Sequence, residues 1–289
     1  MIYNASDSFF IAQNDEFYYL SDNGITAVSK RDGSMYKLLR DPFRTNSESD
    51  CIMALYGSDL YYYDINSVPS EMEIHKLSLN TMISEKIFSK NANGSSGFLG
   101  TVMSGGSSAY EMIYDFFTDG ETLYFMFHEK DGVYRLKNGR FECIIPDRIY
   151  NSQLSFNGQT IFYIDSALDL KCCNVYSSEI ATVETSFANA IYYDGSRILF
   201  SDRNGIFSLN ADTFQTTLIS NFTADKISSD GEHIVFSKGN TLYLLCEDPL
   251  QLGKFENIRT FSVISGSAKV IVKYFTNNDF KIEVLDFAA

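Results

Sequence analysis

The chain has 289 residues, of which 45% are hydrophobic, so it is long enough to bury a large core and is not a disordered protein. Its net charge of −14 disfavours nucleic acid and anionic membrane surfaces as partners, because both attract basic proteins. No apolar run approaches the ~20 residues that span a bilayer. The opening residues, MIYNASDSFF, lack the basic and apolar regions of a signal peptide. We therefore expect no membrane insertion, and a cytoplasmic protein unless a leader has been removed.

A polar turn followed by a short aromatic strand recurs along the chain. The first residues of these turns, in chain order, are Asn14, Gly57, Asp119, Asn157, Asp194, Asp230 and Ser265. The phrases NGQTIFYID (157–165), DGSRILFSD (194–202) and DGEHIVFSK (230–238) show the pattern most clearly. Repetition at about 40 residues is typical of a β-propeller, in which each repeat forms one four-stranded blade.

The individual repeats predict the strands of the blades. Met1–Asn4 precedes the first repeat as a spare strand. The fifth repeat predicts four strands, at Ala190–Tyr193, Arg197–Asp202, Ile206–Asn210 and Thr216–Ser220. The last repeat predicts only three strands, at Thr260–Ser265, Lys269–Thr276 and Phe280–Asp286. We therefore expect Met1–Asn4 to supply the missing outer strand of the last blade and to close the ring.

Seven turns predict an all-β, seven-bladed β-propeller of four-stranded antiparallel blades, folded as a single domain over residues 1–289. A six-bladed ring, with the first or last repeat misread, is the alternative. No segment shows sustained helical periodicity, and the chain contains only 4 Pro to interrupt its strands. We expect most of the 19 Tyr and 24 Phe in the core, because a blade packed between two others buries both of its faces.

The first repeats resemble a known family. FYYLSDNGITAVSKRDGSMYKLL (Phe17–Leu39) resembles bacterial propellers related to the propeller of the low-density lipoprotein receptor. The receptor repeat Tyr-Trp-Thr-Asp has counterparts in Tyr61–Asp64, Phe162–Asp165 and Leu199–Asp202, although this chain contains no Trp. The resemblance implies a propeller and, for the bacterial relatives, a domain of unknown function that is often exported. It favours an extracellular or cell-envelope location if a leader was removed, and it supplies no catalytic residues.

Signals of catalysis are weak in this sequence. His75, His128 and His233 lie far apart, and none has the spacing of a metal ligand. The five cysteines match neither a zinc site nor a disulfide framework. The chain has no nucleophile elbow and no phosphate-binding loop. We therefore expect no catalytic residue, no metal site and no cofactor.

Three long loops, Asp41–Asp50, Asp64–Met72 and Ser89–Ala109, flank the second repeat and fall on one face of the predicted propeller. Loops of this length in compact domains are usually functional or disordered. Aromatic, apolar and arginine residues in or beside them are candidates for binding contacts. These candidates are Phe43, Arg44, Phe98, Leu99 and Tyr110. The alternative is an insertion whose apolar residues pack on the neighbouring blades.

The sequence therefore favours a monomeric, non-enzymatic binding module for an unidentified protein, peptide or glycan. One alternative is a carbohydrate-active hydrolase that uses Asp64, Asp165 and Asp202 near the mouth of the channel. A retaining enzyme would need two carboxyls about 5–5.5 Å apart. Aspartates bonded to the backbone of their own turns would argue against this alternative. Another alternative is a structural domain of a larger envelope protein.

Overall fold

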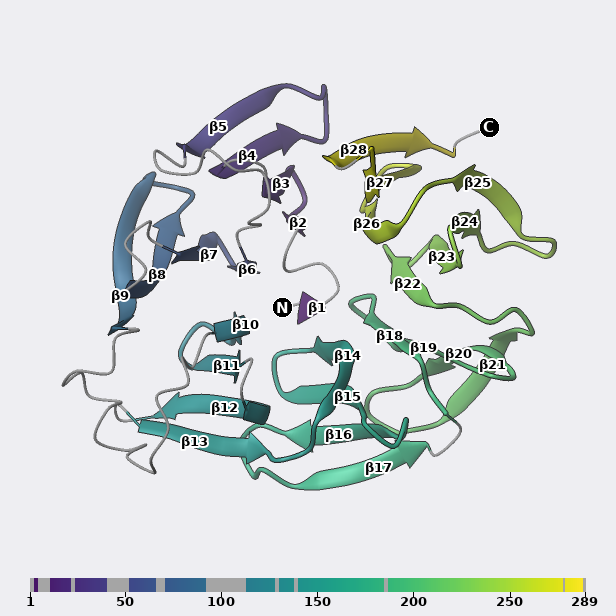
Figure 1. Cartoon of the computed structure of the whole chain (residues 1–289), viewed down its shortest axis with the longest axis horizontal. Coiled ribbons are helices and arrows are strands. Elements are labelled where there is room, and N and C mark those ends of the chain that lie inside the picture. Colours follow the sequence, from purple (N-terminus) through teal and green to yellow (C-terminus); the bar gives the residue numbers. More distant parts are fainter. Residues whose placement is uncertain are drawn as a thin grey trace.

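The computed structural model describes residues 3–4, 11–21, 24–40, 52–65, 71–91, 113–127, 130–137, 140–184, 187–277 and 279–287. Strands and turns make up this part of the chain, and none of it lies in a helix that could cross a membrane. Seven antiparallel sheets stand side by side in a ring (Figure 1). The prediction of a seven-bladed β-propeller is confirmed, and the six-bladed alternative is wrong.

Each blade is a run of consecutive antiparallel strands. Blade one contains β2 (Ile11–Gln13), β3 (Phe17–Ser21), β4 (Gly24–Ser29) and β5 (Met35–Arg40). Blade two contains β6 (Met53–Tyr56), β7 (Asp59–Ile65), β8 (Glu71–Ser78) and β9 (Ile83–Asn91). Blade three contains β10 (Ile113–Thr118), β11 (Leu123–Phe127), β12 (Lys130–Lys137) and β13 (Arg140–Ile145). Blades four and five contain β14 (Ile149–Phe156), β15 (Thr160–Asp165), β16 (Leu170–Asn174), β17 (Ile180–Glu184); and β18 (Ala190–Tyr193), β19 (Ile198–Asp202), β20 (Gly205–Leu209), β21 (Thr216–Ser220). Blades six and seven contain β22 (Lys226–Ser229), β23 (Ile234–Lys238), β24 (Thr241–Leu244), β25 (Leu250–Lys254); and β26 (Ile258–Ile264), β27 (Lys269–Thr276), β28 (Asp279–Asp286). A two-residue strand, β1 (Tyr3–Asn4), precedes them all.

The second strand of a blade is apolar on both faces because each face packs against a different neighbour. Tyr163 belongs to the cluster that joins blades two, three and four, whereas Phe162 packs against blade five. The adjacent thiols of Cys172 and Cys173 divide between the same two clusters, and neither forms a disulfide. Successive residues of a strand point to opposite faces, so a blade needs no polar face.

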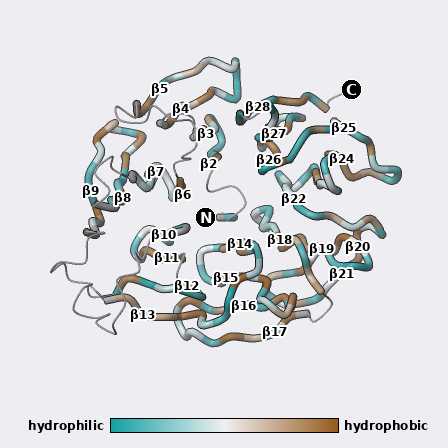
Figure 2. The backbone as a smooth tube through the Cα atoms, viewed as in Figure 1, coloured by the Kyte–Doolittle hydropathy of each residue, from teal (hydrophilic) through white to brown (hydrophobic). Residues whose placement is uncertain are grey.

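Hydrophobic clusters fill every boundary between neighbouring blades, and Figure 2 shows hydrophobic residues recurring along the strands all around the ring. Of the clusters formed by the described residues, the smallest lies where the last blade meets the first. It consists of Ile11, Leu20 and Val28 from blade one and Ile264 and Ile271 from blade seven. Polar contacts add to this apolar packing at the closing boundary.

The predicted closure by Met1–Asn4 is wrong. β1 pairs antiparallel with β14 of blade four, with Tyr3 opposite Phe156 and Asn4 opposite Ser155. Figure 1 shows the N-terminus at the centre of the ring and the C-terminus at its rim. Within the described residues, blade seven keeps three strands, β26 to β28, and no strand of blade one joins its sheet.

A side-chain amide joins the closing blades instead. Gln13 Nε2 donates to the carbonyl of Val263 at 3.0 Å, and Gln13 Oε1 accepts the N–H of Ser265 at 3.0 Å. These two bonds reproduce the pattern that a backbone amide makes in a strand ladder. The buried amide of Asn4 acts similarly on blade five, where it donates to the carbonyl of Tyr193 at 3.0 Å and accepts its N–H at 2.8 Å.

We predict that Gln13→Ala lowers the free energy of unfolding by about 1–2 kcal/mol, because it leaves the Ser265 N–H without this acceptor at a weakly packed boundary. Urea unfolding monitored by tyrosine fluorescence would measure the change. Gln215→Ala, at an exposed turn position, is the matched control and should change stability by less than about 0.5 kcal/mol. Equal effects of the two substitutions would contradict the role given to Gln13.

Candidate binding surface on the turn face

The two faces of the ring differ in which connections they carry. On one face, here named the turn face, emerge the turns between the first and second strands and between the third and fourth strands of each blade. On the other, the loop face, emerge the connections between blades and those between second and third strands. Because strands alternate in direction, this division follows from the antiparallel order of every blade. Both cavities described below open on the turn face.

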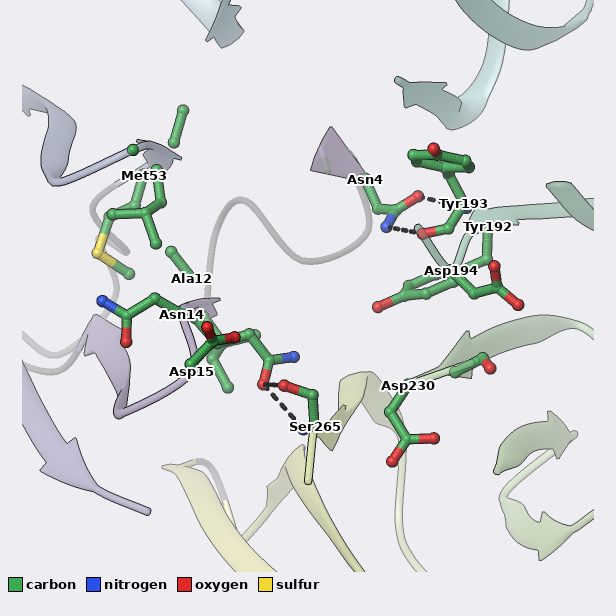
Figure 3. Close-up of a pocket in the computed structure, with 16 residues that line it drawn as sticks. Asn4, Ala12, Asn14, Asp15, Met53, Tyr192, Tyr193, Asp194, Asp230 and Ser265 are labelled. Atoms are coloured by element: carbon green, nitrogen blue, oxygen red, sulfur yellow. Dashed lines mark hydrogen bonds between the residues drawn. The ribbon is translucent and has the colours of Figure 1, made fainter. Parts of the chain in front are cut away.

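The first cavity, of about 390 Å³, lies at the centre of the ring and is named the channel mouth (Figure 3). Its wall is formed by the inner strands β2, β6 and β18. The turns between the first and second strands of blades one, two, five, six and seven complete it. Its polar members include Asn4, Gln13, Asn14, Asp15, Ser229 and Ser265. The carboxylates of Asp15, Asp194 and Asp230 give it an acidic character.

A repeated turn places the acidic residues at the mouth. The Oδ1 atom of Asp194 accepts the N–H groups of Ser196 and Arg197, both at 2.9 Å. The same two bonds, to the second and third residues onward, recur at Asn14, Asp119, Asn157 and Asp230. An Asp or Asn is favoured here because its short side chain satisfies backbone donors that the turn leaves unpaired. The repeat that identified the fold therefore also lines the mouth.

The carboxylate of Asp194 is held in its ionised form. Burial by itself would raise the pKa of this group, but the N–H donors of Ser196 and Arg197 and the guanidinium of Arg197 outweigh it and lower the pKa. Arg197 Nε donates to Asp194 Oδ2 at 2.9 Å. Asp194 is thus committed to its turn, and among the three acids of the mouth Asp15 is the exposed one.

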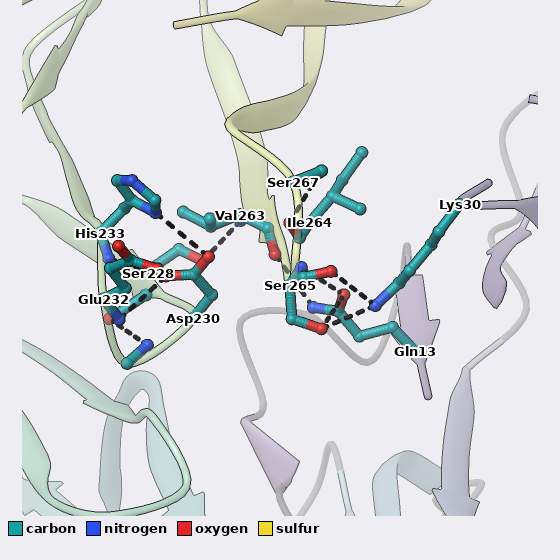
Figure 4. Close-up of polar contacts among 12 residues, drawn as sticks. Gln13, Lys30, Ser228, Asp230, Glu232, His233, Val263, Ile264, Ser265 and Ser267 are labelled. Atoms are coloured by element: carbon teal, nitrogen blue, oxygen red, sulfur yellow. Dashed lines mark hydrogen bonds and ion pairs between the residues drawn. The ribbon is translucent and has the colours of Figure 1, made fainter. Parts of the chain in front are cut away.

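A cationic group reaches the mouth from blade one (Figure 4). Lys30 Nζ donates to the carbonyl of Ser265 at 3.1 Å and to its Oγ at 2.6 Å, beside the Gln13 contact. Burial lowers the pKa of Lys30 to about 8, against the opposing influence of Asp15 and Asp230. The closing boundary of the ring and the rim of the mouth are therefore one polar network.

The second cavity, of about 400 Å³, is an apolar groove between blades one and two. Phe17, Tyr19, Tyr36 and Leu38 of blade one face Leu79 and Met82 of blade two, and polar residues such as Glu16 and Asn80 also line the groove. The rings of Phe17 and Tyr36 meet edge to face with centroids 6.3 Å apart. Tyr36 is 53% exposed and Met82 51%, so both present apolar surface to the solvent.

The groove and the channel mouth adjoin, because Asn14 and Gly57 line both. Asn14 Nδ2 also donates to the hydroxyl of Tyr19 at 3.1 Å, which fixes the ring that floors the groove. The turn face thus offers a hollow of mixed polar and apolar lining with three carboxylates, which continues into a largely apolar groove. Such a combination suits an extended segment with a polar or basic group next to apolar side chains.

The binding residues predicted from sequence, Phe43, Arg44, Phe98, Leu99 and Tyr110, lie outside the described residues. The groove was missed by the sequence analysis, since its walls come from two repeats and each wall alone is an ordinary strand end. A signal existed in the apolar residues of two turn-proximal segments, MYKLL (35–39) and LNTMI (79–83).

Of the three aspartates of the hydrolase alternative, Asp165 and Asp202 are bonded to their own turns, and the side chain of Asp64 lies outside the described part of the structure. Asp165 Oδ1 accepts the N–H groups of Ala167 and Asp169 at 2.9 and 3.0 Å, and Lys171 Nζ lies 2.7 Å from Asp165 Oδ2. Asp202 Oδ1 accepts the N–H groups of Asn204 and Gly205. Both residues end second strands, on the loop face, and both are buried. This is the outcome that argues against the hydrolase.

Metal-binding chemistry finds no support in the described part of the chain, where no three His, Cys, Asp or Glu side chains gather as a metal site. His75 stacks on Tyr62 and contacts Glu73 Oε2 at 2.9 Å. His233 lies 3.3 Å from Asp230 Oδ2 and packs against Phe287. These two histidines belong to separate blades and separate contacts.

Comparison with known proteins confirms the fold. No family model matches the chain, and no curated protein matches it. Similar solved structures include the β-propeller domain of Cps50 (Swd1) from Myceliophteria thermophila, 9% identical over 96% of both chains with a TM-score of 0.59. A chain of the Mitotic Checkpoint Complex is 10% identical, over 100% of this chain and 94% of that one, with a TM-score of 0.58.

PorZ, a bacterial surface component of the type-IX secretion system of Porphyromonas gingivalis, is 10% identical over 98% of this chain, with a TM-score of 0.50. This chain spans 38% of the length of the PorZ chain and 40% of the length of another similar structure, the extracellular domain of BT4673 from B. thetaiotaomicron. At these identities the likeness establishes the β-propeller fold alone. The resemblance to receptor-type propellers gains no support from the comparisons.

We predict that Lys30 makes stability increase with pH. Its pKa is about 8 in the folded protein against 10.5 as the ordinary value, so between these values the unfolded chain binds a proton that the folded chain does not. The free energy of unfolding therefore rises from pH 8 to pH 10.5 on account of this group. Lys30→Met should remove this contribution to the rise in stability. The urea midpoint of the wild type should therefore exceed that of the variant by more at pH 9.5 than at pH 7. Lys254→Met, at an exposed position, is the reference substitution. A wild-type advantage that stays constant between the two pH values would contradict this assignment.

Proposed function

We propose that this chain is a non-enzymatic interaction module that binds an extended peptide segment of a partner protein across its turn face. The observation that carries the proposal is the continuity of the channel mouth with the apolar groove, through Asn14 and Gly57. Together they offer two hollows of about 390 and 400 Å³, one with three carboxylates and one lined by Phe17, Tyr19 and Tyr36. Recognition of a peptide requires this pairing of apolar anchors with a few convergent polar groups.

The chemistry of the two hollows defines the ligand class. Tyr36, Phe17 and Met82 supply polarisable apolar contacts that accommodate an aliphatic or aromatic side chain. Asp15 stands exposed at the mouth, and the chain carries a net charge of −14. A segment with a basic group beside an apolar one therefore fits better than an acidic one, and the overall charge favours its approach.

Other propellers support the proposal at the level of class only. The similar structures include a component of a secretion system and a chain of the Mitotic Checkpoint Complex. Both are named as parts of larger assemblies. The residues predicted from sequence, Phe43, Arg44, Phe98, Leu99 and Tyr110, remain a second candidate surface. A role as a structural domain of a larger envelope protein, suggested by the family resemblance, is compatible with either surface.

We predict that peptides selected from a random library on the immobilised protein lose affinity at least tenfold for Met82→Lys, because the substitution places a charge on the wall of the groove. Fluorescence anisotropy with a labelled selected peptide would measure the dissociation constant. The matched control is Phe214→Lys, since Phe214 occupies the corresponding turn of blade five, with φ of 54° against 58° at Met82 and 46% exposure. Phe214 lines neither cavity.

The loop face is tested in the same assay. Excision of residues 94–106 should leave the affinity unchanged if the turn face binds. Loss of affinity on excision, with Met82→Lys binding as the wild type does, would contradict the proposal and assign the ligand to the loop face. Equal losses for Met82→Lys and Phe214→Lys would show a non-specific effect of charge and would also contradict it.

A further inference from the structure

The third strand of blade seven is exposed where the corresponding strands of other blades are covered. Each of the other six third strands contains a fully buried residue: Ile25, Ile74, Val133, Leu170, Ile206 and Leu242. β28 contains none, and its Ile282 and Val284 are 37% and 46% exposed. Within the described residues, no strand pairs with the outer edge of β28, although its eight residues make it one of the longest strands. An open edge of this length is a template for another strand.

We propose that β28 pairs edge to edge with β28 of a second copy of this chain, in an antiparallel register centred on Ile282. Antiparallel partners either both direct their N–H and C=O groups at each other or both direct them away. Along β28, every second residue directs its backbone N–H and C=O groups toward the open edge. The hydrogen bonds between the two copies therefore form only when even-numbered residues lie opposite even-numbered residues and odd-numbered opposite odd-numbered. A twofold axis must then pass through a residue of β28.

The choice among these registers follows from charge. Centring on Lys281 would oppose two lysines and set Asp279 against Glu283, whereas centring on Glu283 would oppose two glutamates. Like charges directly opposite are destabilising. Centring on Ile282 sets Lys281 against Glu283 twice, by symmetry, and sets Phe280 against Val284 twice. Registers further out shorten the overlap, so the sequence FKIEV (280–284) is self-complementary in this one register.

The faces of the joined sheet also agree. A twofold axis perpendicular to the sheet keeps Phe280, Ile282 and Val284 of both copies on one face and both Lys281–Glu283 pairs on the other. Phe280 already packs against Phe275 and under Lys273 of its own blade, and Glu283 accepts the hydroxyl of Tyr274 at 3.3 Å. These contacts lie within one copy and leave the edge accessible. A short edge contact buries less than the ~1,200 Å² of stable interfaces, so the dimer is weak and depends on concentration.

The inference is independent of the turn-face site, because β28 forms no part of either cavity. It replaces the sequence-based expectation of a monomer. A dimer would then present two peptide sites, which raises the apparent affinity for a partner with two matching segments.

Sedimentation equilibrium of the full chain over a range of concentrations tests the proposal. The wild type is expected to dimerise. Lys281→Glu and Glu283→Lys each create two like-charged pairs and should raise the dimer dissociation constant about tenfold or more. The double variant Lys281→Glu/Glu283→Lys restores opposite charges and should recover the wild-type constant. Thermal melts of all four proteins at low concentration check that the monomer fold is intact.

A cross-linking experiment tests the register itself. In a Cys143→Ser/Cys246→Ser background, Ile282→Cys places two thiols directly opposite each other across the twofold axis and should give a disulfide-linked dimer on mild oxidation. Val284→Cys lies opposite Phe280 and should link far less. A wild type that stays monomeric at all concentrations, a double variant that fails to recover, or equal linking at 282 and 284 would overturn the proposal.

Discussion

Closure of the ring by the side-chain amide of Gln13 is the interaction on which the remaining features depend. A ring of seven blades must join its last blade to its first, and among the clusters formed by the described residues the one at that boundary is the smallest. The two bonds from Gln13 to Val263 and Ser265 add directional pairing between the inner strands. No strand has to be shared between the ends of the chain. The protein thus closes at its axis through an amide of blade one and the backbone of blade seven.

Three consequences follow from closure at the axis. β1 is not needed at the rim and pairs with β14 of blade four. The buried amide of Asn4 in β1 also bonds Tyr193 of blade five. Among the described residues blade seven keeps β28 as its outer strand, and no strand pairs with its outer edge. Gln13 and Ser265 of the closing network line the channel mouth, and Lys30 donates to Ser265. Architecture and candidate binding surface are therefore connected through one set of contacts.

The sequence predicted what is local and missed what joins distant segments. All seven turns were predicted correctly, and in five of them an Asp or Asn bonds the N–H groups two and three residues onward, which is a local arrangement. The turn bonds of Asp165 and Asp202 were foreseeable for the same reason. Gln13 and Ser265 are 252 residues apart in the sequence, and Asn4 and Tyr193 are 189 apart. Local sequence patterns therefore do not predict either contact. The groove between Tyr36 and Met82 combines two repeats, and only the register of blades one and two brings them together.

Hydrogen–deuterium exchange of a variant that lacks residues 1–4 tests the central claim most directly. If the ring closes through Gln13, the deletion should speed exchange in 149–156 and 190–193, the inner strands of blades four and five that β1 contacts. Exchange in 258–264 and 269–276, and in the amides by which β28 pairs with β27, should be unchanged. Faster exchange across blade seven, with blades four and five unaffected, would contradict the account and restore a shared strand as the means of closure.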